Sequence, residues 1–193
     1  MYNFINRFFA LLISTILIPV ILFIYFFLLK KIGNPIIFRQ KRSGLNGKSF
    51  YLYKFRTMQL KKNKKEIQRI YKSTLFLRTS RLDELPQLFN IIKGDLNFVG
   101  PRPLLPEYNK LYNIKQKKRL NVMPGITGWA QVNGDNNISW SKKFKLDIWY
   151  VENKSIYLDI KIVLLTINFV LKKIIYKKNK EKIIIVKKFN GKN

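Results

Sequence analysis

The stretch RTSRLDELPQLFNIIKG, residues 78–94, decides how this chain folds around its most organised polar residues. Its apolar positions recur at the spacing of one helix face, at Leu82, Leu85, Phe89 and Ile92. Lys93 and Gly94 supply a helix stop. Proline is tolerated only in the first helical turn, so Pro86 predicts a helix that begins at about Asp83.

Asp83 and Glu84 would therefore lie at a helix N-terminus. Unpaired backbone N–H groups and the positive end of the helix dipole favour a carboxylate there, and they also favour a phosphate. An N-cap aspartate followed by a first-turn glutamate is equally a common stabilising arrangement without chemistry. This segment alone leaves both interpretations open.

The chain is strongly basic: its 193 residues include 38 Lys and Arg against 10 Asp and Glu, a net charge of +28. Such a charge predicts anionic partners, which are nucleic acid, phospholipid headgroups or phosphorylated substrates. Cysteine and histidine are both absent, which excludes disulfides, thiolate chemistry and the commonest general base and metal ligand. Any chemistry must use carboxylates, hydroxyls, amines and guanidinium groups.

The N-terminal region carries an uncharged run from Phe8 to Leu29, followed by two lysines. As a helix it would reach roughly 33 Å, enough for a hydrocarbon core of about 30 Å, and it is too long for a typical signal peptide. Pro19 lies near the middle of the run and predicts a kink. The run is either a straight transmembrane helix or a re-entrant hairpin, and the lysines after it predict a remainder that faces the cytoplasm.

Two strands are expected next, over residues 36–41 and 50–58, joined by the turn signal of Asn46 and Gly47. Lys54 and Arg56 are two residues apart and therefore share one face of the second strand. That face is either a solvated charged surface or part of a site.

Three later segments carry further signals. Arg102 stands between two prolines, whose stiff backbone suits bidentate phosphate recognition, with an ordinary loop arginine as the alternative. Residues 124–134 contain three glycines and a tryptophan, which suggests a tight loop approached by a ligand. Residues 144–171 combine apolar density, aromatic rings and lysines, typical of an interfacial helix, with a buried core helix as the alternative.

In this order, four motifs resemble the bacterial sugar transferase family: KFRTM at 54–58, DELPQ at 83–87, the segment 94–103 that ends in GPRP, and PGITGW at 124–129. The resemblance covers residues 8–171, and residues 189–191 resemble a remnant of the family's terminal motif. Members are small, membrane-anchored, monotopic phosphoglycosyl transferases. The resemblance implies a mixed α/β, mostly helical fold with a re-entrant N-terminal membrane helix hairpin, a short β-hairpin, a catalytic helix and amphipathic interfacial helices.

The same resemblance implies transfer of a phospho-sugar from a UDP-sugar to polyprenyl (undecaprenyl) phosphate, with release of UMP. Asp83 would be the nucleophile that forms an acyl-phosphate intermediate, and Glu84 would help to bind Mg²⁺ or organise the site. Asp83 and Glu84 are thus also the candidate Mg²⁺ ligands. Further positions that match the family near the substrate or its phosphates are Lys54, Arg56, Arg78, Arg102, Asp147 and Asp159. Asp135 stands where members often carry arginine.

The expected organisation is a membrane anchor over residues 1–31, a cytoplasmic transferase domain over 32–171 and a basic tail over 172–193. The expected location is the bacterial inner membrane, where an anionic lipid surface joins the UDP-sugar and polyprenyl phosphate as partners. The product would enter polysaccharide or glycoprotein glycan assembly. Nucleic acid is not an expected partner, because a long apolar run and an acidic pair in the most organised motif fit it poorly. A non-catalytic membrane scaffold of the same fold is the alternative function.

Overall fold

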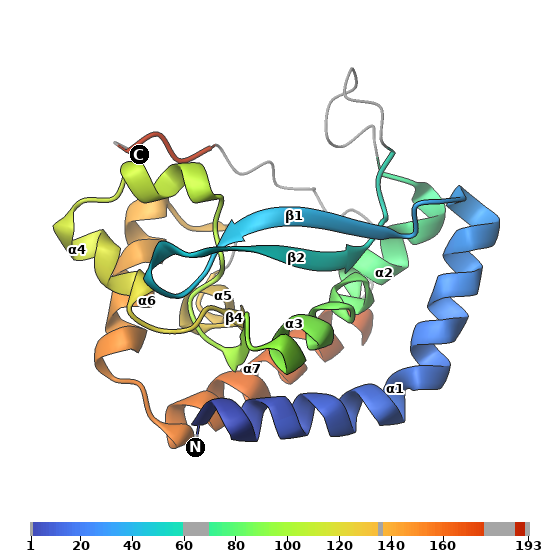
Figure 1. Ribbon diagram of the computed structural model, residues 1–193, viewed down its shortest axis with the longest axis horizontal. Helices are drawn as coiled ribbons and strands as arrows, with labels where there is room; N and C mark the ends of the chain where they lie inside the picture. Colours follow the sequence, from blue (N-terminus) through green and yellow to red (C-terminus); the bar gives the residue numbers. More distant parts are fainter. Residues whose placement is uncertain (1, 60–69, 135–136, 176–187, 192–193) are drawn as a thin grey trace.

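The computed structural model describes residues 2–59, 70–134, 137–175 and 188–191. Its helices are α1 (Tyr2–Ile32), α2 (Leu75–Thr79), α3 (Gln87–Lys93), α4 (Ile114–Lys117), α5 (Trp129–Val132), α6 (Trp140–Glu152) and α7 (Ile156–Ile175). Its strands are β1 (Ile37–Ser43), β2 (Ser49–Phe55), β3 (Asn97–Val99) and β4 (Gly125–Thr127). The described part of the chain is mostly helical with two small sheets, which confirms the mixed α/β class (Figure 1).

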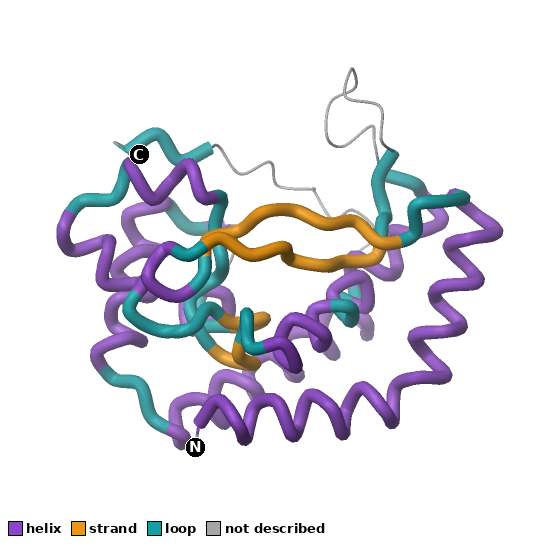
Figure 2. The backbone as a smooth tube through the Cα atoms, in the orientation of Figure 1, coloured by secondary structure: helices purple, strands orange, loops and turns teal. Residues whose placement is uncertain are grey.

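The β-hairpin predicted from the sequence is formed by β1 and β2, which pair antiparallel along their whole length. Their connection places Asn46 and Gly47 at φ values of 53° and 77°, the left-handed region that these two residue types tolerate best. β3 and β4 form a separate parallel pair. Figure 2 shows the hairpin lying across α3, the helix that follows the two carboxylates.

The apolar run folds into one long helix, α1, which changes direction partway along its length (Figure 1). Pro19 lies inside this helix, in agreement with the kink predicted there. Proline removes one backbone donor, so the helix bends without being interrupted, and α1 is a single bent helix instead of two helices joined by a turn. α1 is long and apolar enough to cross a membrane, and most of its side chains are exposed.

Both ends of α1 are fixed to the rest of the chain. Near the N-terminus, the Asn6 side-chain oxygen accepts a hydrogen bond from the Phe98 N–H at 3.0 Å, and Arg7 donates to the Lys93 carbonyl at 3.4 Å. At the other end, the Arg56 guanidinium donates at 2.6–2.7 Å to the carbonyl oxygens of Ile32, Gly33 and Pro35. The first and last turns of α1 therefore lie against the same globular body.

The helix predicted to begin at about Asp83 begins one turn later. A 3₁₀ turn spans Leu82–Glu84, and α3 starts at Gln87 with Pro86 as its N-cap. Arg81 precedes the turn in the left-handed conformation, with φ at 58°. The predicted start was wrong because the chain first winds as a tighter 3₁₀ turn before it widens into the α-helix. The two carboxylates thus lie on a short separate turn.

α3 is packed between α1 and the β1–β2 hairpin. Its buried face lies in one core cluster with Ala10 of α1, Leu52 of β2 and Leu96. Gly94 ends the helix in the left-handed conformation with φ at 85°, which confirms the predicted helix stop. The turn that carries the carboxylates is therefore positioned from both α1 and β2.

Close backbone contacts require two of the three glycines in residues 124–134, Gly125 and Gly128. A Cβ on Gly125 would overlap the Gly100 backbone nitrogen, and a Cβ on Gly128 would overlap the Gly100 carbonyl oxygen. A Cβ on Gly100 itself would overlap the Met123 carbonyl oxygen. The glycines let the segment before Arg102 and the segment around β4 approach each other more closely than any side chain would allow.

The two interpretations of residues 144–171 apply to different helices. α6 packs into the core through Phe144 and Tyr150, whereas α7 buries Leu158 and Ile162 on one face only. Exposed apolar side chains run along the rest of α7, at Ile156, Tyr157, Ile160, Leu164, Ile167, Leu171 and Ile175. α7 therefore has the character expected of an interfacial helix.

The predicted basic tail at 172–193 lies mostly outside the described residues, as does Asp135. Phe189, which belongs to the motif at 189–191, is buried in an aromatic cluster with Tyr108, Tyr112 and Phe144. This part of the C-terminal segment is therefore packed against the domain.

The backbone contact at Gly100 predicts a large loss of stability in Gly100→Ala. The added methyl group overlaps backbone, which cannot rotate away, so we expect a loss of about 2–3 kcal/mol in unfolding free energy. Gly44→Ala is the matched control. Its Cβ would come no closer than 3.0 Å to another atom, the Lys48 carbonyl oxygen, whereas a Cβ on Gly100 would lie much closer than that to the Met123 carbonyl oxygen. Thermal unfolding of the detergent-solubilised variants measures the difference, and equal stability in both would contradict the close contact.

Candidate active site

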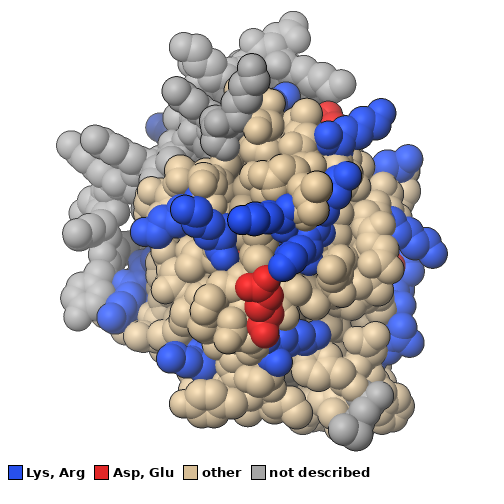
Figure 3. All heavy atoms as spheres, turned by 90° about the vertical axis from the view of Figure 1, so that its left-hand side faces the viewer, with Lys and Arg blue, Asp and Glu red and all other residues tan. Residues whose placement is uncertain are grey.

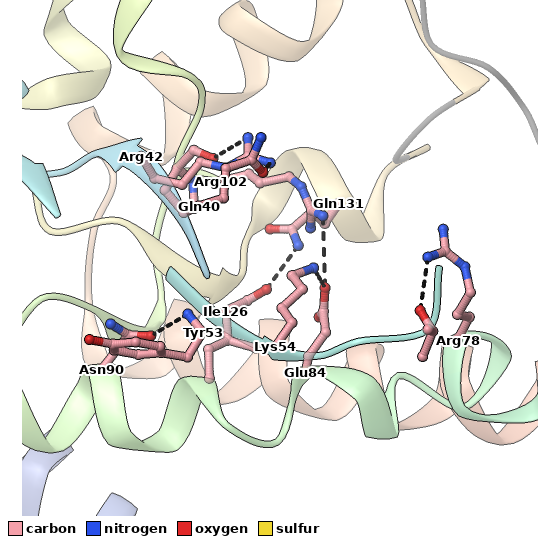
Figure 4. A network of polar contacts seen from close by, with 12 residues as sticks. Gln40, Arg42, Tyr53, Lys54, Arg78, Glu84, Asn90, Arg102, Ile126 and Gln131 are labelled. Atoms are coloured by element: carbon pink, nitrogen blue, oxygen red, sulfur yellow. Dashed lines mark hydrogen bonds and ion pairs between the residues drawn. The ribbon is translucent and has the colours of Figure 1, made fainter. Parts of the chain in front are cut away.

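Two adjacent carboxylates, Asp83 and Glu84, form the centre of the site. Both side chains are largely buried, with 8% and 9% of each residue exposed. Glu84 Oε1 accepts a hydrogen bond from Lys54 Nζ at 2.5 Å, and Arg102 Nη2 lies 3.8 Å from the same oxygen (Figure 4). The turn before α3, strand β2 and the loop after β3 thus meet at one carboxylate.

The two carboxylates have pKa values displaced in opposite directions. Burial alone would raise the pKa of Glu84, but the cations around it outweigh this effect and lower that pKa to about 2; they are Lys54, Arg102 and Arg81. Burial raises the pKa of Asp83 to about 6, and the charge of Glu84 adds to the increase. Neighbouring carboxylates with separated pKa values are typical of sites in which the two groups have different tasks.

Asp83 is less restrained than Glu84. Within the described residues, neither a hydrogen bond nor an ion pair joins the Asp83 carboxylate to another side chain. Three cations, Lys54, Arg78 and Arg102, lie close enough to lower its pKa against the effect of burial. At neutral pH the side chain is therefore mostly ionised, poorly solvated and surrounded by positive charge, which suits a nucleophile toward phosphorus.

Arg78 and Arg102, both predicted from the sequence, are brought to the carboxylates. Arg78 donates a hydrogen bond to Thr57 Oγ1 at 3.2 Å, beyond the end of β2 (Figure 4). The Arg102 side chain is 41% exposed, so it can still bind an anion while it faces Glu84. Together with Lys54 they surround the pair with cations from three different segments.

Arg42 belongs to the same site and was missed in the sequence. Its guanidinium donates to the Pro103 carbonyl at 3.3 Å and to Gln40 Oε1 at 2.7 Å (Figure 4). Burial and the nearby Arg102 lower its pKa to about 10. The period of two along β1 places Gln40 and Arg42 on one face, and this was the signal that could have identified the residue.

Arg56 is not directed at the carboxylates. Its Nε and Nη2 atoms are occupied by the carbonyl oxygens at the end of α1. The shared strand face expected for Lys54 and Arg56 does not extend to the second residue, because β2 ends at Phe55. In this conformation Arg56 holds the C-terminal end of α1.

Asp147 is connected to the site through Arg119. Its carboxylate accepts hydrogen bonds from buried Arg119 at 2.9 and 3.0 Å, and Arg119 donates onward to the Arg102 carbonyl oxygen at 2.7 Å. Asp147 thus fixes the arginine that holds the backbone of the Pro-Arg-Pro loop.

Asp159 is also buried, but it lies on α7 and accepts a hydrogen bond from the Tyr150 hydroxyl at 2.7 Å. Its contacts join α7 to α6. Burial raises the pKa of Asp159 to about 7.

The site contains few side chains that could bind a metal ion, the carboxylates of Asp83 and Glu84. No cluster of three or more acidic, histidine or cysteine side chains occurs within the described ranges. Glu84 Oε2, however, is buried without a hydrogen-bond partner among these residues, and the Asp83 carboxylate is close enough to Glu84 for the Glu84 charge to raise its pKa. Mg²⁺ commonly uses one or two carboxylates and completes its shell with water and substrate phosphates, so these residues fit that mode of binding.

Comparisons with known proteins show the family of the chain. The family model described as bacterial sugar transferase matches residues 1–173. An uncharacterized sugar transferase of Bacillus subtilis, EpsL, is 55% identical over 146 residues, which are 73% of this chain and 72% of the relative. The UDP-glucose:undecaprenyl-phosphate glucose-1-phosphate transferase of Escherichia coli is 38% identical over 173 residues, 82% of this chain and 37% of that protein.

A third relative is the undecaprenyl-phosphate galactose phosphotransferase of Salmonella typhimurium, 32% identical over 186 residues. The match covers 85% of this chain and 39% of that relative. The chain therefore spans well under half the length of these two longer proteins.

The buried Asp159 predicts a pH dependence of stability. Its pKa in the folded state, about 7, exceeds the ordinary carboxyl value of about 4, so folding takes up a proton between these values. The stability that this group contributes is complete below about pH 4 and is lost as the pH rises through about 7.

Asp159→Asn mimics the protonated side chain and should remove this dependence. The melting temperature of the wild type should fall below that of the variant as the pH rises from 6 to about 8. Asp95→Asn, at a partly exposed carboxylate, is the control. Parallel pH profiles for wild type and Asp159→Asn would contradict the prediction.

Proposed function

Because the chain belongs to the bacterial sugar transferase family, we propose that it transfers a sugar 1-phosphate from a UDP-sugar to undecaprenyl phosphate and releases UMP. The observation that carries the proposal is the buried carboxylate pair, with separated pKa values, inside a ring of lysine and arginine. Relatives with these activities are named after undecaprenyl phosphate, glucose and galactose. Such a transfer would be the first membrane step of polysaccharide or glycoprotein glycan assembly.

In the proposed mechanism, an Asp83 carboxylate oxygen attacks the phosphorus atom that carries the sugar. A bond forms between this oxygen and phosphorus, and the phosphoanhydride bond to UMP breaks, so UMP leaves with the bonding electron pair. An oxygen of undecaprenyl phosphate then attacks the same phosphorus and restores the Asp83 carboxylate. Both steps develop negative charge on phosphate oxygens, which Arg78 and Arg102 are placed to stabilise.

Glu84 has a different task in this scheme. Its lowered pKa keeps it ionised, and its Oε1 atom holds Lys54 and faces Arg102. We propose that Oε2 and Asp83 hold Mg²⁺ together with the donor's phosphates. When bound, the ion would neutralise the diphosphate and favour departure of UMP.

We place the protein at the bacterial inner membrane, with α1 inserted re-entrantly and the domain on the cytoplasmic side. The exposed apolar side chains of α1 and α7 support burial in the membrane and at its interface. Figure 3 shows that Lys and Arg outnumber Asp and Glu on the face built around α4 and α6, which favours anionic substrates and lipid headgroups.

The covalent scheme predicts a burst of UMP in the absence of the lipid acceptor. With Mg²⁺ and a suitable donor from a panel that includes UDP-glucose and UDP-galactose, the wild type should release about one UMP per enzyme. Asp83→Asn should abolish the burst, because a neutral amide is not a competent nucleophile, whereas Glu84→Gln should slow it. Glu152→Gln, at an exposed carboxylate paired with Lys118, is the control and should behave as wild type. A full burst in a folded Asp83→Asn variant would refute Asp83 as nucleophile.

The attachment of both ends of α1 to one body predicts that the N-terminus lies on the cytoplasmic side. The natural chain has no cysteine, so a single cysteine can report the side directly. In intact cells, Tyr2→Cys should resist an impermeant thiol reagent as fully as Ser49→Cys in the domain, and both should react after lysis. Labelling of Tyr2→Cys in intact cells would instead establish a straight membrane span.

A further inference from the structure

A cavity adjoins the site at Arg42 and Arg102. It has a volume of about 200 Å³ and is lined by residues of α5, α6 and the Pro-Arg-Pro loop. Arg42 and Arg102 line both this pocket and the small cavity that contains Lys54 and Glu84. Its volume is below the roughly 300–1,000 Å³ of pockets that enclose a whole drug-sized ligand, so it fits one part of a nucleotide sugar.

The lining is cationic and therefore suits an anion. Five basic side chains contribute to it: Arg42, Arg102, Arg119, Lys143 and Lys188. The acidic side chain in the lining is Asp147, which is already paired with Arg119 at 2.9 Å. A neutral sugar would not use this charge, whereas a phosphate would.

The pocket also has an aromatic wall. Trp140, Phe144 and Tyr108 contribute to it; Phe144 and Tyr108 are buried in the core, and Trp140 is the half-buried ring of the three. Flat aromatic surfaces favour a planar ring as their ligand.

Two residues that line this pocket each carry a buried polar atom without a partner among the described residues. Gln131 lines the pocket and is 4% exposed, and its Nε2 donates to the Ile126 carbonyl at 2.9 Å, which fixes the orientation of the amide (Figure 4). Its Oε1 therefore faces away from Ile126 as an acceptor with no hydrogen bond. Arg42 Nε is likewise a buried donor with none. A ligand that satisfies both must bring one N–H group and one acceptor.

We propose that this pocket binds the uridine monophosphate end of the donor, with the uracil N3–H donating to Gln131 Oε1 and the phosphate held by Arg42 and Arg102. The inference rests on the proposed function and specifies where the leaving group lies. UMP would then lie on the α5 and α6 side of the reacting phosphorus, and the sugar would lie on the open side of the site. Gln131 becomes the residue that distinguishes uracil from cytosine, which has no N–H at ring position 3.

Competitive inhibition by free nucleotides tests this assignment. UMP should inhibit the wild type more strongly than CMP, and Gln131→Leu should weaken inhibition by UMP about tenfold, the scale of one buried hydrogen bond, and remove the preference over CMP. Inhibition by inorganic pyrophosphate should stay unchanged in this variant. Gln116→Leu, on α4 and away from the pocket, is the matched control and should keep the wild-type preference. Retention of the UMP preference in Gln131→Leu, or its absence in the wild type, would overturn the assignment.

Photo-crosslinking with 4-thio-UMP gives a second readout that does not depend on turnover or on folding of a variant. Crosslinks located by mass spectrometry should fall on α5 or α6 of the wild type, and crosslinks confined to other elements would also overturn it. If the wild type releases no UMP from any donor while 4-thio-UMP labels α5 or α6, the proposed transfer fails and the nucleotide pocket stands.

Discussion

The arrangement of the site depends on the compensation of one buried charge, the ionised carboxylate of Glu84, by nearby cations. A buried charge is tolerated only with close countercharges, and Glu84 obtains them from Lys54 of β2 and Arg102 of the Pro-Arg-Pro loop. These contacts join the turn that carries Asp83 and Glu84, the hairpin and the loop into one site. They also leave Asp83, the adjacent residue, largely buried but without a strong partner of its own within the described chain. One carboxylate is thereby fixed, and the other is left available for reaction.

α1 and the site are connected near both ends of the helix, through α3 and through Arg56. The N-terminal half of α1 packs on α3, which continues directly from the turn that carries Asp83 and Glu84. The C-terminal end of α1 is held by Arg56, just beyond the strand that carries Lys54. The carboxylates are therefore positioned by elements that touch α1, which suits the proposed transfer to a membrane lipid.

Long elements and local stop signals could be predicted from the sequence. The apolar run, the Asn46-Gly47 turn and the Gly94 helix stop each depend on chemistry within a few neighbouring residues, and all three are confirmed. The parallel pair β3 and β4 was not predicted, because strands of three residues are too short to show a period of two. The start of α3 was placed one turn too early, since a first-turn proline does not distinguish a 3₁₀ turn from an α-helix.

The site residues likewise divide into those whose place could be predicted from the sequence and those whose contacts could not. Lys54, Arg78 and Arg102 surround the carboxylates as expected, whereas the contacts of Arg56 and Asp147 depend on tertiary partners, a helix end and a buried arginine. Arg42 and the close approach at Gly100 likewise appear only when distant segments meet. Sequence patterns identified the residue types that the site needs, but not which of the matching charges face it.

The central claim is that Asp83 becomes covalently attached to the phospho-sugar. The most direct measurement is to mix the enzyme with its UDP-sugar and Mg²⁺ without lipid acceptor, quench with hydroxylamine, and map the resulting hydroxamate by peptide mass spectrometry. Hydroxylamine converts an acyl phosphate into a hydroxamate at the carboxyl group that carried it. A hydroxamate at Asp83 is the predicted result. Its absence while undecaprenyl phosphate is converted normally, or its location at Glu84, would contradict the account.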